Sequence, residues 1–147
     1  MLPAYQAGGD LPPGVHRATL HETLGRFGVG SVQRVAIAQR LGRTYALTAS
    51  TGRLARFVVF GTFVTAKPEP NDVDVFLLMD DAFDVSQVTG ETRLLFEHAA
   101  AQAHFGASVF WLRRLAALGG EQATVEHWQI RRDGGLRGIV EIVPEAA

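Results

Sequence analysis

Apolar residues follow a helical spacing in the first third of the chain. Thr19 is placed to cap a short helix that runs to about Phe27, and Ser31 is placed to cap a longer helix that follows. The apolar face predicted for the longer helix consists of Val32, Val35, Ala38, Leu41 and Tyr45. The residues predicted to lie largely on its other faces are Arg34, Arg40 and Arg43.

After residue 50 the pattern changes to short apolar runs that are typical of strands. Residues 57–60 and 73–78 are predicted strands, and the segment between them contains two prolines and continues neither of them. The elements predicted downstream are a helix at 90–104 that Gly106 ends, a strand at 108–112, a short helix at 121–128, a turn at 133–135 and a strand at 138–143.

This order of helices and strands predicts an α+β fold, in which a mixed β-sheet carries helices mainly on one face. The length of 147 residues is that of one domain, so we expect a single domain over residues 1–147. Its first part, residues 1–13, is predicted to be an extended or partly ordered tail. The sequence leaves open whether the first 30 residues pack on this domain or on another copy.

Composition narrows the class of protein. Hydrophobic residues make up 47% of the chain and charged residues 20%, which is the balance of a folded domain. No apolar run approaches the roughly 20 residues that span a bilayer, and the N-terminus lacks the pattern of a secretory signal, so a cytoplasmic location without a membrane partner is expected. The absence of cysteine excludes disulfides and thiolate zinc sites. With a net charge of −1, the chain has no overall electrostatic attraction to nucleic acid.

Two acids at the start of the second predicted strand are the main candidates for chemistry. Alternate residues of a strand share a face, so Asp72 and Asp74 project together while Val73 and Val75 point the other way. Their Cα atoms are expected to lie roughly 6–7 Å apart. Two carboxylates at this spacing are costly to bury alone, but they suit hard cations such as Mg²⁺ or Mn²⁺, which take carboxylate and phosphate oxygens together.

The segment before these acids offers groups for phosphate. Gly61 ends the preceding strand and lets an anion approach the backbone, and the Thr62 hydroxyl is a donor for phosphate oxygens. Lys67, the single lysine of the chain, lies in the same segment, where its ammonium could neutralise part of a triphosphate. A solvated loop position is the alternative for Lys67.

Gly61-Thr62, nine further residues and then Asp72-Val73-Asp74-Val75 resemble the signature of the DNA polymerase beta-like nucleotidyltransferase superfamily. More narrowly, residues 11–16 (LPPGVH), 61–68 (GTFVTAKP) and 138–142 (GIVEI) are similar to a bacterial group of uncharacterised minimal nucleotidyltransferase-like proteins. The resemblance implies that Asp72 and Asp74 are the catalytic metal ligands and that Gly61 and Thr62 hold the phosphates of a nucleoside triphosphate such as ATP.

The same resemblance implies a transferase that moves a nucleoside monophosphate to a protein, an RNA such as tRNA, or a small molecule. It also implies a role in a toxin–antitoxin pair, with a toxin-like protein as partner. Thr62 is a small departure from the family pattern, which usually has Gly or Ser there, and it retains a hydroxyl. Ser108 is a larger departure, because it stands on the next strand, where the superfamily has a third carboxylate. A hydroxyl is a poor substitute for an acid that also acts as general base. Glu141, on the last strand, is the replacement that the sequence offers.

Two alternatives therefore stay open beside the enzyme. The first is a catalytically impaired nucleotide- or protein-binding module with the same fold, which Ser108 favours. The second is a homo-oligomeric scaffold whose two acids are only solvated. Asp80, at the far end of the same strand, is about 20 Å from Asp74 along an extended chain and is expected to lie outside the site. The five histidines show no i,i+4 pair, which argues against a zinc site.

Overall fold

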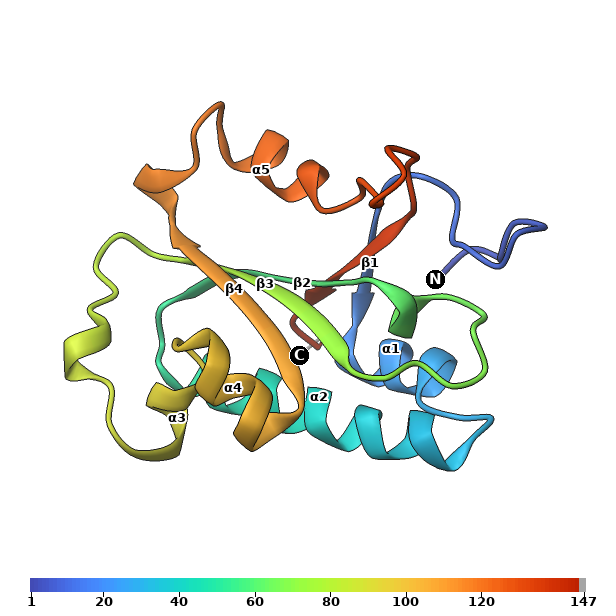
Figure 1. Cartoon of the computed structure of the whole chain (residues 1–147). Coiled ribbons are helices and arrows are strands. Elements are labelled where there is room, and N and C mark those ends of the chain that lie inside the picture. Colours follow the sequence, from blue (N-terminus) through green and yellow to red (C-terminus); the bar gives the residue numbers. More distant parts are fainter. Residues whose placement is uncertain (146–147) are drawn as a thin grey trace.

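The computed structural model of the chain describes residues 1–145 and contains one five-stranded sheet (Figure 1). Its strands are β1 (Val15–Thr19), β2 (Leu54–Phe60), β3 (Val73–Met79), β4 (Ala107–Arg113) and β5 (Ile139–Val143). They lie in the spatial order β1-β5-β2-β3-β4. The pairs β1–β5 and β3–β4 are parallel, and β2 runs antiparallel to both β3 and β5. The sheet is therefore mixed, and the predicted α+β class is confirmed.

The helices lie mainly on one face of this sheet, as predicted. They are α1 (Leu20–Phe27), α2 (Val32–Ser50), α3 (Gly90–Leu94), α4 (His98–Phe105) and α5 (Glu121–His127). Helices α1 to α4 lie below the sheet in Figure 1 and cover the larger hydrophobic core, whereas α5 lies above it. A smaller apolar cluster on the α5 face joins Val58, Phe76, Leu78, Val125 and Ile139. The sheet thus has a fully covered face and a second face that is only partly covered.

Local capping fixes the helix ends that the sequence indicates. Thr19 caps α1 through a capping box, in which its hydroxyl accepts from the Glu22 amide and the Glu22 carboxylate accepts from the Thr19 amide. The Ser31 hydroxyl accepts from the Arg34 amide at 3.1 Å and caps α2. Gly106 ends α4 with a φ of 63°, in the left-handed region that favours glycine. These three predictions are confirmed.

The helix predicted at 90–104 is interrupted. It consists of α3 and α4, which are separated because Leu95 and Phe96 turn into the core between them. The Phe96 ring lies 4.7 Å from the Phe83 ring and 5.4 Å from the Trp111 ring, measured between centroids. Packing against these two aromatic rings overrides the helical propensity of the segment.

The buried stripe of α2 also differs from the prediction. Val32 and Val35 are exposed, at 89% and 46%, whereas Arg34 is only 6% exposed. The buried positions of the helix are Arg34, Ile37, Ala38, Leu41, Thr44 and Thr48, which also follow a helical spacing. None of the helices described in residues 1–145 combines the length and apolar character that a membrane span requires.

The first 30 residues pack on their own domain. Strand β1, which the sequence analysis did not predict, pairs in parallel with β5 from Val15↔Ile139 to Thr19↔Val143. Leu11, just before it, is fully buried in the main core. Residues 1–14 contain no helix or strand, residues 6–10 form a hydrogen-bonded turn, and the segment is tied to the domain by contacts described below.

Candidate functional site

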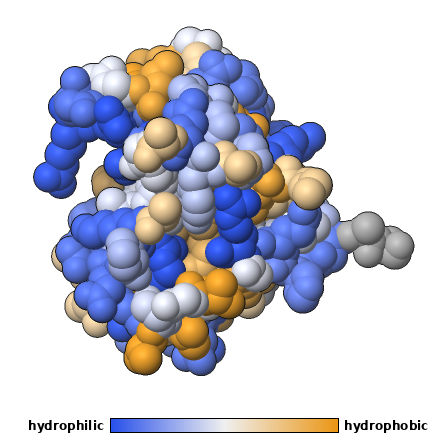
Figure 2. All heavy atoms as spheres, turned by 90° about the vertical axis from the view of Figure 1, so that its right-hand side faces the viewer, coloured by the Kyte–Doolittle hydropathy of each residue, from blue (hydrophilic) through white to orange (hydrophobic). Residues whose placement is uncertain are grey.

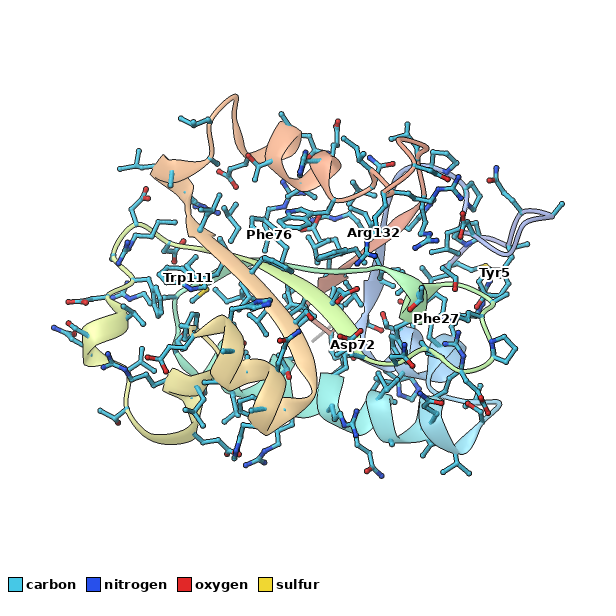
Figure 3. All side chains as sticks on the ribbon, viewed as in Figure 1. Tyr5, Phe27, Asp72, Phe76, Trp111 and Arg132 are labelled. Atoms are coloured by element: carbon cyan, nitrogen blue, oxygen red, sulfur yellow. The ribbon has the colours of Figure 1, made fainter. Side chains whose placement is uncertain are left out.

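Asp72 and Asp74 lie side by side at the start of β3. Asp72 directly precedes the strand and Asp74 is its second residue, so both share the α5 face with Phe76. Val73 and Val75 are fully buried on the opposite face. Figure 3 shows Asp72 at the beginning of β3, below the segment that carries Arg132. Both carboxylates are half-buried, and among residues 1–145 neither has an arginine or lysine within ion-pair distance.

The glycine bend lies directly against the second acid. Gly61 has a φ of 80°, and a Cβ atom at this position would lie 2.2 Å from Oδ2 of Asp74. Phe60, the residue before the bend, is the cross-strand partner of Asp74. Only glycine meets both the backbone conformation and the close approach of the carboxylate. The predicted juxtaposition of the bend and the two acids is therefore present in the fold.

The charge of this acid pair is poorly compensated. Burial and the neighbouring charge of Asp72 raise the pKa of Asp74 to about 6, against an ordinary value of 3.8. The more distant charges of Arg132 and Arg137 lower this pKa but do not cancel the effect. Ionisation of Asp74 beside Asp72 is therefore unfavourable in the fold.

Ser108 lies where the sequence analysis expected a third acid. It is the β4 partner of Asp74 in the parallel β3–β4 register. Its hydroxyl is 3.2 Å from Oδ2 of Asp72, to which it donates, and accepts from the Gln102 amide at 3.1 Å. A neutral hydroxyl thus lies at the position where the third carboxylate was expected.

Glu141 does not replace the missing acid. Its carboxylate accepts from Arg56 at 2.6 Å and 3.0 Å, and Arg56 also donates to Gln122. Glu141 pairs with Val58, which in turn pairs with Phe76, so Glu141 lies two strands away from Asp74 and two residues further along the sheet. It does not line the cavity described below. Within residues 1–145 no group of three His, Asp or Glu side chains is arranged to hold a metal ion. The donors next to Asp74 are therefore one further carboxylate and one hydroxyl, a set that suits Mg²⁺ if substrate phosphates complete it.

A cavity of about 830 Å³ adjoins the two acids. One side of it is aromatic: the Trp128 ring lies 4.6 Å from the Phe60 ring and 5.1 Å from the Phe110 ring, between centroids. Its polar lining includes Thr62, Asn71, His98 and Gln102 beside the acids. Trp128 thus forms part of the wall of the candidate site.

The other side of the cavity is basic. Its cationic side chains are Lys67, Arg131, Arg132 and Arg137. The three arginines belong to residues 129–137, here termed the arginine hairpin, in which Ile130 and Leu136 form an antiparallel bridge. Nothing in the local sequence relates Arg131 and Arg132 to Asp72 and Asp74. Figure 2 views the molecule from the side of Figure 1 on which this hairpin lies, and it shows mostly hydrophilic residues with smaller apolar patches.

A buried arginine holds the segment that carries Gly61, Thr62 and Lys67. This segment, residues 61–71, is termed the Gly61 loop. The Arg34 guanidinium donates to the carbonyl oxygens of Phe63 at 2.8 Å and Thr65 at 2.6 Å, and also to that of Lys67. Burial lowers the pKa of Arg34, since its partners are neutral carbonyls. Arg34 was assigned to an outer face of α2, although its spacing from Ile37 and Leu41 could have identified it as part of the buried stripe.

The predicted phosphate-binding residues line one cavity. Gly61, Thr62 and Lys67 all line the same cavity as Asp72 and Asp74, with Lys67 at its exposed rim. Asp80, in contrast, lies at the far end of β3 beside Arg114, as expected. The sequence analysis did not find the aromatic wall or the arginine hairpin.

The comparisons with known proteins identify a family but no activity. A protein-family model described as a family of unknown function (DUF6932) matches residues 3–143, so the chain belongs to this family. No curated protein and no solved structure matches the chain.

Proposed function

We propose that the chain is a Mg²⁺- or Mn²⁺-dependent nucleotidyltransferase of the DNA polymerase beta-like type, which transfers a nucleoside monophosphate from a nucleoside triphosphate to an acceptor. One observation carries this proposal. Two uncompensated carboxylates, Asp72 and Asp74, lie against the Gly61 bend and face a basic wall across a cavity of about 830 Å³. This volume lies within the range of about 300–1,000 Å³ that is usual for small-molecule sites.

In this proposal, each side of the cavity binds a different part of the substrate or the metal ion. Asp72 and Asp74 hold the divalent cation, and Thr62 and Lys67 bind phosphate oxygens. The cation, when bound, supplies charge stabilisation at the phosphoryl group undergoing transfer. The rings of Phe60, Phe110 and Trp128 provide a surface for the base, where stacking contributes about 1–3 kcal/mol per base in other nucleic-acid sites.

A nucleotide-binding module without turnover is the second candidate, and Ser108 is the observation that favours it. The Ser108 hydroxyl donates its proton to Asp72 and accepts one hydrogen bond from Gln102. It cannot act as the general base that activates an acceptor hydroxyl in the way a carboxylate would. In this alternative the chain binds the nucleotide and acts through a protein partner.

We propose the cytoplasm as the setting and leave three classes of acceptor to the experiment: a protein, tRNA and a small molecule. A toxin-like protein from an adjacent gene is the first protein to test, since the residues that resemble minimal nucleotidyltransferases suggest a toxin–antitoxin pair. The state of the purified chain in solution, monomer or homo-oligomer, is measured in parallel, because a scaffold role would require an oligomer.

Incubation of the full chain with α-labelled ATP, Mg²⁺ and each acceptor tests the proposal. We expect label to pass to one acceptor, and we expect Asp74→Asn to abolish the transfer while Glu69→Gln, at an exposed loop acid, leaves it unchanged. Saturable ATP binding without transfer to any acceptor would favour the binding module. Absence of both binding and transfer would refute the nucleotide-dependent function altogether.

A further inference from the structure

One of the three arginines of the arginine hairpin differs from the other two in its ion-pair partners. Arg131 donates to Asp10 at 2.9 Å and also to Asp133, and Arg137 donates to Asp10 at 2.9 Å. Arg132 has no hydrogen-bond or ion-pair partner within the described part of the chain, although it stands between these two paired arginines. It is exposed and lines the cavity. Its charge is therefore available to a ligand.

Arg132 faces the acid pair. Its side chain lines the same cavity as Asp72 and Asp74. Figure 3 shows Arg132 above Asp72, reaching from the hairpin toward the start of β3. An anionic ligand bound between them would meet the cation-binding acids on one side and the guanidinium on the other.

The hairpin is held in one position by a short turn of its own. Asp133 accepts from the Gly135 amide at 2.8 Å and from Arg131 at 2.9 Å, and Gly134 has a φ of 86°. The Arg131 amide closes the turn by donating to the Gly135 carbonyl at 2.8 Å. The turn fixes the backbone on either side of Arg132, which reduces the entropy that binding a ligand would otherwise cost.

The N-terminal segment anchors the hairpin to the domain. Both carboxylate oxygens of Asp10 are engaged, and its side chain is only 16% exposed. The Gly14 amide donates to the Gln129 side chain at 2.6 Å, and the Gly138 amide donates to the Leu11 carbonyl at 3.1 Å. Residues 10–14 thus bind both ends of the hairpin as well as its two paired arginines.

The same segment also touches the Gly61 loop. The Ala66 amide donates to the Gly9 carbonyl at 2.8 Å, and the Tyr5 hydroxyl donates to the Thr65 carbonyl at 3.3 Å. A smaller pocket of about 290 Å³ lies between the N-terminal segment and the Gly61 loop. Its lining residues include Gly9, Lys67 and Arg137, and both Lys67 and Arg137 also line the main cavity. The N-terminal segment therefore sets the distance between the Gly61 loop and the hairpin.

We propose that Arg132 binds the terminal phosphates of a nucleoside triphosphate, and that Asp10 is a positioning residue that fixes the hairpin for this contact. The inference rests on the proposed function and adds the residues that recognise the terminal phosphates of its substrate. Lys67 and Arg132 are the two cavity cations without an ion-pair partner among residues 1–145, and they suit the two phosphoryl groups that lie beyond the acid-bound one. Arginine binds such groups through paired, charge-assisted hydrogen bonds.

Binding of phosphate compounds to the full chain in Mg²⁺ tests the proposal, with ATP, AMP and inorganic tripolyphosphate as probes. We expect Arg132→Ala to weaken the binding of ATP and tripolyphosphate at least tenfold and to change AMP binding less than twofold. The matched control is Arg53→Ala, at an exposed arginine outside the cavity, for which we expect no change. Calorimetric titration measures all three affinities.

Asp10→Asn tests the positioning role. We expect it to weaken tripolyphosphate binding while AMP binding is kept, and we expect the double variant with Arg132→Ala to lose no more than Arg132→Ala alone, because both act through one contact. A merely structural role would lower the melting temperature and the affinities for all probes alike, which would overturn the assignment of Asp10.

The outcomes separate this inference from the proposed function. If the wild-type chain binds ATP and tripolyphosphate and Arg132→Ala binds both equally well, the role of Arg132 is refuted while the proposed function stands. If the wild-type chain binds neither probe in Mg²⁺, the inference and the proposed function are refuted together.

Discussion

Replacing Asp74 by Asn is expected to stabilise the metal-free protein. Burial and the charge of Asp72 raise the pKa of Asp74 from 3.8 to about 6, so the folded state binds a proton at this carboxyl more tightly than the unfolded state does. Above pH 6 the carboxylate is ionised in both states and its charge destabilises the fold. Below about pH 4 it is protonated in both states and the penalty disappears. Asn lacks the charge at every pH.

The magnitude follows from the shift in pKa. A shift of about 2 units corresponds to roughly 3 kcal/mol, at about 1.4 kcal/mol per unit. Because the carboxylate is only half-buried, solvent screening reduces the expected gain to about 1–2 kcal/mol at pH 7.5. For a domain of this size, such a gain raises the melting temperature by about 3–6 °C.

Urea unfolding in the presence of a chelator measures this gain at pH 7.5 and again near pH 4. The wild type and Asp74→Asn are compared with Glu69→Gln, which removes the same charge from an exposed loop. We expect Asp74→Asn to be more stable at pH 7.5 and equal to the wild type near pH 4, with Glu69→Gln unchanged at both. Mg²⁺ should then stabilise the wild type and not Asp74→Asn. A less stable Asp74→Asn protein at pH 7.5 would refute the argument that this acid is under electrostatic strain.

Three further substitutions follow from the same contacts. Gly61→Ala is expected to lower the free energy of unfolding by about 2 kcal/mol or more, because the alanine Cβ would lie 2.2 Å from Asp74 at a φ of 80°. Urea unfolding measures this loss, and an unchanged stability would contradict the close contact. Arg34→Met is expected to cost about 3 kcal/mol, since it removes the guanidinium donors from the buried carbonyls of Phe63 and Thr65 in the Gly61 loop and from that of Phe27. Proteolysis within residues 61–71 should accelerate, and Arg40→Met is its control on the same helix. Ser108→Asp is expected to lower the stability of the metal-free protein by about 1 kcal/mol and to raise the affinity for Mg²⁺ about tenfold. Calorimetry measures the affinity, and an unchanged affinity would place residue 108 outside the metal site.

The acid pair and its glycine could be predicted because the relevant geometry is local. The period of two along a strand puts Asp72 and Asp74 on one face, whatever sheet contains them. Gly61 and Asp74 come together because a strand, a short connection and a second strand form an antiparallel pair, in which Phe60 and Asp74 are partners. The caps at Thr19 and Ser31 depend on bonds within three residues.

The missed features depend on contacts between distant segments. The short strand β1 is specified mainly by its pairing with β5, more than a hundred residues later, and its own sequence has no clear alternation. Arg34 is buried because loop carbonyls about 30 residues away satisfy its guanidinium. The hairpin arginines reach the cavity because Asp10, at the other end of the chain, pairs with two of them. No local pattern carries this information.

The central claim is that Asp72 and Asp74 together bind a divalent cation with a nucleotide, and a Mn²⁺ titration followed by electron paramagnetic resonance measures this most directly. The signal of free Mn²⁺ is recorded with a non-hydrolysable ATP analogue and the wild type, the double variant Asp72→Asn/Asp74→Asn, or Glu69→Gln. We predict that the wild type and Glu69→Gln remove more free Mn²⁺ than the analogue alone and that the double variant does not. Equal removal of Mn²⁺ by the double variant and the wild type would contradict the account.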